Sequence, residues 1–176
     1  MAPRDSSAFI QGTAQEGRAW ARLGAQAETQ DALARVERLV SPLPMPDEPE
    51  HHYKYDPAKA ESYLATTLSW VGDPAAEEII RDVVVRLEAG TDGGPPRPRR
   101  AALARLDLSV ALVAAHKADE AAYITLDAVQ SGLLVPTNFW RVTEVVDGIE
   151  EQGAPQAAEV RSAFQDIYSR GHRPLP

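Results

Sequence analysis

The sequence contains no cysteine among its 176 residues. This absence excludes disulfides, cysteine-ligated zinc, iron–sulfur clusters and thiol nucleophiles, and it is typical of a cytoplasmic protein. The sequence also lacks a run of about eighteen apolar residues, so we expect no membrane-spanning helix. Its first ten residues have no basic start followed by an apolar core, so we expect no signal peptide.

Aromatic residues are sparse, at 6% of the chain, and basic residues are outnumbered by acidic ones. The resulting net charge of −8 disfavours nucleic-acid binding through a broad basic surface. Apolar residues make up 44% of the chain, which is enough for one domain with a sizeable core.

Motifs that carry catalysis or bind metals are also missing from the sequence. There is no Gly-x-Ser-x-Gly elbow, and no Gly-rich loop ends in Gly-Lys-Ser/Thr. His51 and His52 lie among acidic residues, but adjacent side chains do not converge readily on one ion, and His116 and His172 have no helix-spaced partner. We therefore expect no enzyme activity, no cofactor and no metal site.

The clearest pattern present is a helical hairpin from Asp56 to Leu87. Apolar residues recur at i, i+3, i+4 and i+7 on both sides of a Gly72-Asp73-Pro74 turn, which indicates two amphipathic helices. Asp56-Pro57 and Asp73-Pro74 each place a capping carboxylate before a proline suited to the first helical position.

Similar patterns recur along the chain, and strict alternation typical of strands does not occur. The sequence therefore predicts an all-α fold, with four hairpins at about 6–41, 56–89, 97–132 and 136–169. The fifth predicted helix, from about Pro98 to Ala115, carries a broad apolar stripe and should be buried on more than one side. Asp119 is expected to cap the sixth helix.

The first hairpin resembles a tetratricopeptide repeat in the stretch GRAWARLG, residues 17–24. Aligning the hairpins on their turns matches Gly24, Gly72, Lys117 and Gly153. The resemblance implies a right-handed α-α superhelix in one domain, 1–176, with small residues where paired helices cross. The turns are spaced more widely than the roughly 34 residues of the usual repeat.

Four further stretches carry a more specific resemblance: DEPEHHYKYDPAK (47–59), VGDP (71–74), ARLDLSVAL (104–112) and VPTNFWR (135–141). Together they resemble the C-terminal tetratricopeptide-like domain of actinobacterial, Streptomyces-type, helix-turn-helix transcription regulators. This implies a sensor or interaction domain. Because the first helix already belongs to the first hairpin, we expect no DNA-binding domain in this chain, and DNA contact only through a helix-turn-helix module outside it.

The face formed by the first helix of each hairpin is the expected ligand-binding groove. Transferring repeat positions through the turn alignment gives its candidate residues: Arg18, Arg22, Lys59, Ser62, Thr66, Trp70, Asp107, Trp140 and Thr143, together with Gln11 of the first hairpin and Asp147 of the fourth. Such a groove would be basic at one end, acidic at the other and aromatic between.

Two functional hypotheses follow from these patterns. The first is a regulatory domain that binds a peptide, a partner protein or a small-molecule signal in the groove and acts on transcription through a DNA-binding module elsewhere. The alternative is a homo-oligomerisation or scaffold module, for instance a homodimer, that takes no small ligand.

Overall fold

The computed structural model describes residues 7–44, 54–90 and 95–171. Within these ranges the chain forms α-helices, one short 3-10 helix and no strand, which confirms the predicted all-α fold. The elements in chain order are α1 (Ser7–Arg22), α2 (Gln26–Val40), α3 (Pro57–Val71), α4 (Ala76–Ala89), α5 (Pro98–Ala114), α6 (Ala118–Gln130), η1 (Pro136–Asn138), α7 (Phe139–Glu151) and α8 (Ala157–Gly171).

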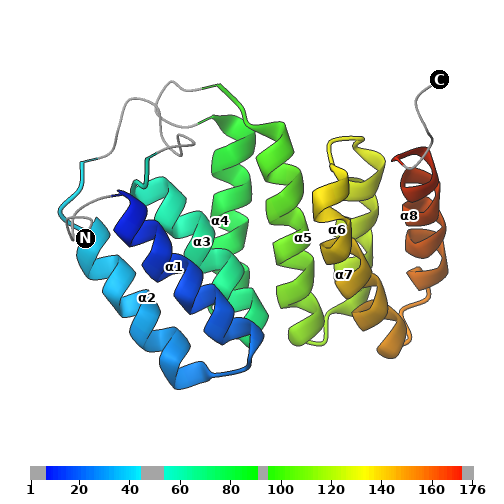
Figure 1. The fold of residues 1–176 in the computed structure, drawn as a ribbon. Helices are drawn as coiled ribbons and strands as arrows, with labels where there is room; N and C mark the ends of the chain where they lie inside the picture. Colours follow the sequence, from blue (N-terminus) through cyan, green and yellow to red (C-terminus); the bar gives the residue numbers. More distant parts are fainter. Residues whose placement is uncertain (1–6, 45–53, 91–94, 172–176) are drawn as a thin grey trace.

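The helices are antiparallel pairs that follow one another across the molecule (Figure 1). α1 packs on α2, α3 on α4, α5 on α6 and α7 on α8. The odd-numbered helices also contact one another in order, α1 with α3, α3 with α5 and α5 with α7. One side of the molecule is therefore built from the first helices of successive pairs.

The turns inside the four pairs share one hydrogen-bond pattern. In each, a residue in the left-handed region is followed by an N–H that donates to the carbonyl five residues earlier, which satisfies a carbonyl that the helix end leaves unpaired. These bonds are Ala25 N to Trp20 O (3.0 Å), Asp73 N to Leu68 O (3.0 Å), Lys117 N to Leu112 O (2.8 Å) and Ala154 N to Ile149 O (3.0 Å).

Three of these left-handed residues are the predicted turn glycines, Gly24, Gly72 and Gly153. In the third pair the position belongs to His116, with φ of 58°, and the alignment on Lys117 was therefore wrong by one residue. A glycine adopts this conformation without steric cost, whereas histidine does not.

The helix starts agree with the predicted caps at one place and differ at two. The Asp56 side chain accepts from Lys59 N at 2.9 Å, and Pro57 is the first helical residue, as predicted. Asp73 instead accepts from Ala75 N, and α4 begins only at Ala76, so Pro74 lies in the turn. Asp119 lies in the first turn of α6, where its charge favours the helix dipole, but it is not the cap.

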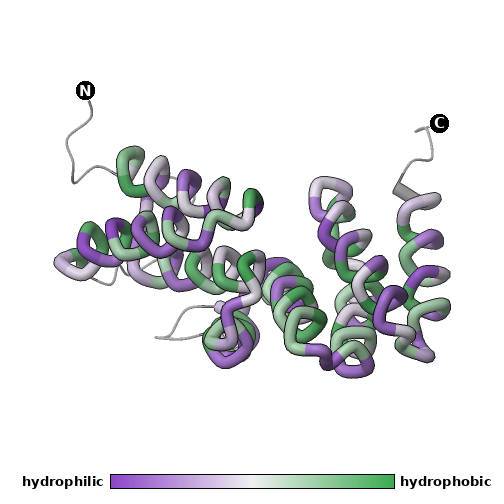
Figure 2. The backbone as a smooth tube through the Cα atoms, turned by 90° about the horizontal axis from the view of Figure 1, so that it is seen from below, coloured by the Kyte–Doolittle hydropathy of each residue, from purple (hydrophilic) through white to green (hydrophobic). Residues whose placement is uncertain are grey.

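The core is continuous from α3 to α8, with a smaller apolar group between α1, α2 and Tyr55. α5 is its centre, and it contacts α3, α4, α6 and α7, which confirms burial on more than one side. Leu106 and Leu112 are fully buried there, and each such side chain contributes about 1.5–3 kcal/mol. Figure 2 shows hydrophobic and hydrophilic residues alternating along each helix.

Small residues allow the helices to approach closely. A Cβ added to Gly17 would lie 3.1 Å from the Ala32 Cβ, where α1 crosses α2. A Cβ added to Gly148 would lie 2.6 Å from Val113 Cγ1, where α7 crosses α5. Side chains larger than hydrogen do not fit at Gly148 unless Val113 moves.

Candidate ligand-binding cleft

A cleft of about 680 Å³ opens along the side built from α1, α3, α5 and α7. This volume is within the usual range for small-molecule sites. The described charged residues on its wall are mostly basic: Arg18, Lys59, Arg100 and Arg141 line it, and Asp107 is the single carboxylate among them.

The structure brings most of the predicted groove residues to this cleft. Those on its wall are Gln11, Arg18, Lys59, Ser62, Thr66, Asp107 and Trp140. Arg22 and Trp70 lie beside it. The Trp70 ring contacts the Arg18 guanidinium and the Trp140 ring, and the Arg22 guanidinium lies over the Trp140 ring. Thr143 is not on the wall, and its hydroxyl donates to Phe139 O of its own helix at 3.2 Å.

The expected acidic end is not formed. Asp147 lies outside the cleft and pairs with Arg161 of α8 at 3.2 Å. Asp107 is on the wall, but Arg141 neutralises it. The cleft is therefore basic and aromatic without an acidic counterpart at its other end.

Asp107 and Arg141 form a buried ion pair between α5 and α7. The Arg141 Nη1 donates to Asp107 Oδ1 at 2.5 Å, and the Thr66 hydroxyl of α3 donates to Oδ2 at 2.6 Å. Both charged side chains are almost completely buried. Burial raises the pKa of Asp107, while the charge of Arg141, the Thr66 hydrogen bond and the charge of Arg18 oppose this shift.

Two tryptophans and three arginines form a stacked group at the edge of the cleft. The Trp70 and Trp140 ring centroids are 6.0 Å apart. The guanidinium carbons of Arg18, Arg22 and Arg141 lie 4.8, 5.0 and 5.5 Å from the Trp70 centroid. These distances are within the range of cation–π attraction, so the rings hold three cations close together.

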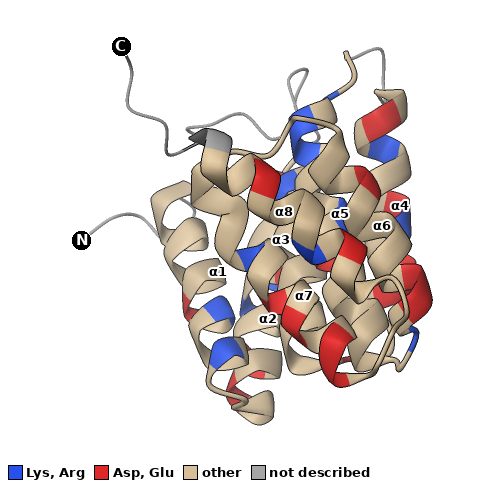
Figure 3. Ribbon diagram, turned by 90° about the vertical axis from the view of Figure 1, so that its right-hand side faces the viewer, with Lys and Arg blue, Asp and Glu red and all other residues tan. Residues whose placement is uncertain are grey.

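A long-range ion pair fixes one side of this stacked group. Arg22 Nη1 of α1 donates to Glu144 Oε1 of α7 at 2.5 Å. Figure 3 shows basic residues of α1 beside acidic residues of α7 in this region. The first and last odd-numbered helices are thereby connected directly.

Like Trp70 and Glu144, Arg18 has a buried polar atom without a hydrogen-bond partner among the described residues. Its Nε is buried without a hydrogen-bond partner, and no described carboxylate lies within ion-pair distance of it. The side chain instead stacks on Tyr63 at 4.9 Å and on Trp70. Burial, and then the nearby charge of Arg141, lower the pKa of Arg18. Such a guanidinium offers directed donors to an anion entering the cleft.

Sequence reasoning missed Arg141 and Tyr63 as site residues. Arg141 was part of the VPTNFWR stretch, but its role was not assigned. The available signal was a lone arginine on the buried stripe of α7, beside Val142 and Val145. A buried charge needs a partner, and Asp107 occupies an equally apolar stripe on α5. Tyr63 was not among the candidate residues, yet its hydroxyl accepts from Gln11 Nε2 at 2.9 Å.

Residues 7–44, 54–90 and 95–171 hold no group of three or more potential metal ligands, and none of their helices is long and apolar enough to cross a membrane. The His51-His52 pair lies outside the described residues. Comparisons with protein-family models, curated proteins and solved structures return no match for the chain.

Proposed function

We propose that the chain is a tetratricopeptide-like helical-repeat domain that binds an anionic ligand in the cleft. Three features support a right-handed superhelix of this type: successive antiparallel pairs, one shared turn pattern, and contacts in order between the odd-numbered helices. In such repeats the stacked first helices form the concave binding surface.

The ligand's charge follows from Arg18, which is the single observation that carries the proposal. Asp107 has Arg141 and Thr66 as its hydrogen-bond partners, and it acts on Arg18 only through its charge, without an ion pair between them. A carboxylate or phosphate on a ligand would satisfy the Arg18 donors, and Trp140, which is 45% exposed, would pack on its apolar part.

The ligand class that fits this site best is an acidic segment of a peptide or partner protein. A small-molecule signal with an anionic group would use the same contacts. We propose that its binding regulates transcription, because four stretches of the sequence resemble the C-terminal tetratricopeptide-like domain of helix-turn-helix regulators. DNA contact then belongs to a module outside this chain, and the domain binds its ligand without catalysis.

The test is isothermal titration of the full chain with hexaglutamate and, as a control, hexalysine. Hexaglutamate should bind, and Arg18→Gln should weaken it about 10- to 100-fold, because a hydrogen bond to a charged group contributes about 1.5–3 kcal/mol. Arg38→Gln, at an exposed position of α2 away from the cleft, makes the same charge change and should leave the affinity for hexaglutamate unchanged.

Equal loss in the two variants would show that binding depends only on overall charge and would contradict the proposal. The oligomerisation alternative is separated by light scattering of the same samples. A dimer that dissociates on Arg18→Gln and binds neither peptide would favour that alternative.

A further inference from the structure

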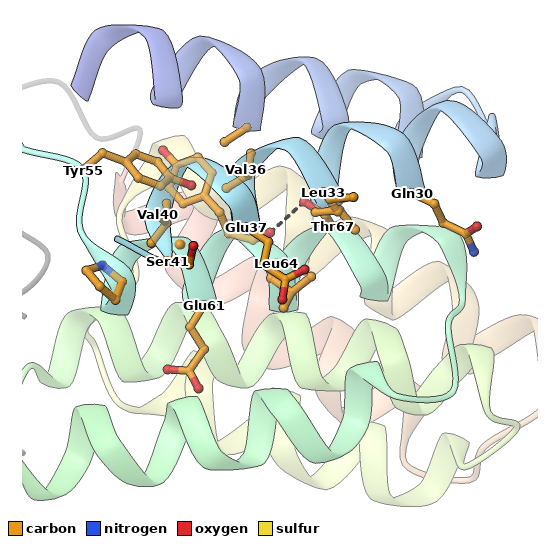
Figure 4. Close-up of a pocket in the computed structure, with 15 residues that line it drawn as sticks. Gln30, Leu33, Val36, Glu37, Val40, Ser41, Tyr55, Glu61, Leu64 and Thr67 are labelled. Carbon is orange, nitrogen blue, oxygen red and sulfur yellow. Dashed lines mark hydrogen bonds between the residues drawn. The ribbon is translucent and has the colours of Figure 1, made fainter. Parts of the chain in front are cut away.

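A second pocket, of about 520 Å³, lies between α2 and α3 at the N-terminal end of the molecule. Figure 4 shows Tyr55 at one end of this pocket and Gln30 at the other, with the side chains of α2 and α3 between them. Its volume suits a small organic molecule. Tyr63 lines both this pocket and the cleft, but the two otherwise have different walls.

The wall of the second pocket is apolar and carries charge of one sign. Leu33, Val36, Val40 and Leu64 supply much of its surface. Among the described residues, the ionisable groups on the wall apart from the two tyrosines are glutamates, and no lysine or arginine lines it. An anionic ligand is therefore disfavoured here, in contrast to the cleft.

The two glutamates differ in their availability. Glu61 forms an ion pair with Arg86 of α4 at 3.0 Å. Glu37 is exposed on α2, and among the described residues it has no ion-pair partner. Figure 4 shows Glu37 near the middle of the pocket, next to Leu64. A cation at this point would gain a partner without breaking an existing pair.

Tyr55 supplies an unsatisfied polar group at one end. The residue is 4% exposed, and its buried hydroxyl has no hydrogen-bond partner in the part of the chain that the structure describes. The ring meets Tyr63 edge to face with centroids 5.8 Å apart, and the Ser7 hydroxyl accepts from Tyr55 N at 3.1 Å. Burial raises the pKa of Tyr55, so the hydroxyl stays protonated. Buried hydroxyls normally have a partner, which makes this one a mark of an unfilled site.

We propose that this pocket binds a hydrophobic organic cation, a molecule with an apolar body and one ammonium group. The body packs on Leu33, Val36 and Leu64. The ammonium group takes Glu37 as its counter-charge, because the two tyrosine rings already have Arg18 and Lys59 over them. The pocket and the cleft thus select ligands of opposite charge.

The experiment is isothermal titration of the full chain with n-octylammonium chloride and, separately, with sodium octanoate. The two probes share an apolar chain and differ in the sign of the head group. Octylammonium should bind saturably, and octanoate should bind at least about tenfold more weakly, since a like-charge contact replaces a favourable one. Equal binding of the two, or no binding of octylammonium, would overturn the proposal.

Three variants locate the site. Glu37→Gln should weaken octylammonium binding about two- to fivefold, as expected for an exposed ion pair. Ala34→Phe should fill the pocket and abolish binding while the circular-dichroism spectrum stays helical. Glu28→Gln, on the exposed face of the same helix and outside the pocket, is the matched control and should bind normally.

Other occupants give different results. If a basic amphipathic peptide binds and octylammonium does not, the pocket is a docking site for a partner helix, and the small-ligand proposal is wrong. If Glu37→Gln and Glu28→Gln weaken binding equally, the cation binds through overall charge and not in this pocket.

Discussion

Single residues determine the chemistry of the cleft. The arrangement of the helices around the cleft depends on the ion pair between Asp107 and Arg141. The two side chains connect α5 to α7, and Thr66 extends the connection to α3. Because both charges are almost completely buried, each depends on the other for compensation.

Arg141→Met should lower the free energy of unfolding by about 3–5 kcal/mol at neutral pH, because it leaves Asp107 buried and uncompensated. Urea denaturation followed by circular dichroism measures this change. The double variant Asp107→Asn/Arg141→Met removes both charges and should lose clearly less. If the double variant lost as much free energy of unfolding as Arg141→Met and Asp107→Asn lose separately and added together, the pairing would be contradicted.

The same variant has a predictable pH dependence. Burial raises the pKa of Asp107 in the folded protein, so the folded state holds this proton more tightly than the unfolded chain. The corresponding stability is present below the unfolded pKa and is lost as pH rises through the folded pKa. Arg141→Met removes the largest opposing charge, so its deficit relative to the parent should shrink between pH 7 and pH 4. A deficit independent of pH would contradict this account.

The sequence predicted two of the three residues in this hydrogen-bonded group. Asp107 and Thr66 were predicted to face the groove because repeat positions place residues on helix faces. Arg141 was not, because it is 34 residues from Asp107 and only the packing of α7 on α5 brings the two together. The acidic end failed for the same reason, since Asp147 finds Arg161 on a neighbouring helix.

At the scale of helices and turns, local sequence was a better guide. Glycines and prolines marked three of the four hairpin turns because the left-handed conformation strongly favours glycine. The turn of the third pair was misplaced by one residue, at Lys117, because His116 and not a glycine has the left-handed conformation there. The α4 start was placed two residues early because Asp73 closes a turn before the helix begins.

His116→Gly should stabilise the protein by about 1 kcal/mol, because glycine adopts the left-handed conformation without the steric cost that histidine pays. Gly72→Ala at the equivalent turn should destabilise by a similar amount. Thermal unfolding of the two variants should therefore shift in opposite directions. A lower melting temperature for His116→Gly would show that the histidine side chain contributes more than its backbone costs.

Gly148→Ala should destabilise by about 1–3 kcal/mol, because the new methyl group overlaps Val113 where α7 crosses α5. The double variant Gly148→Ala/Val113→Ala should recover part of this loss. Gly12→Ala is the control. Gly12 lies at an exposed position of α1 where an added Cβ meets nothing within 4 Å, so the variant should stabilise the protein slightly. Chemical denaturation measures all three, and equal effects at the two glycines would contradict close packing at this crossing.

At the scale of the whole molecule, charge is distributed unevenly. The chain carries a net charge of −8, yet the cleft wall holds four basic residues and one carboxylate that is already paired. An acidic ligand is repelled at long range and attracted within the cleft, which favours partners that match its shape over polyanions in general. The cleft combines residues of four odd-numbered helices, so it exists only in the assembled fold.

The most direct test uses the three tryptophan indole N–H signals in a 1H–15N spectrum, assigned by Trp→Phe variants, during titration with hexaglutamate. Trp70 and Trp140 contact the arginines of the cleft, whereas Trp20 is not on its wall. We predict saturable shifts of the Trp70 and Trp140 signals and an unchanged Trp20 signal. A shift of the Trp20 signal alone, or no shift of any of the three signals at hexaglutamate concentrations up to millimolar, would contradict an anion-binding cleft on the odd-numbered helices.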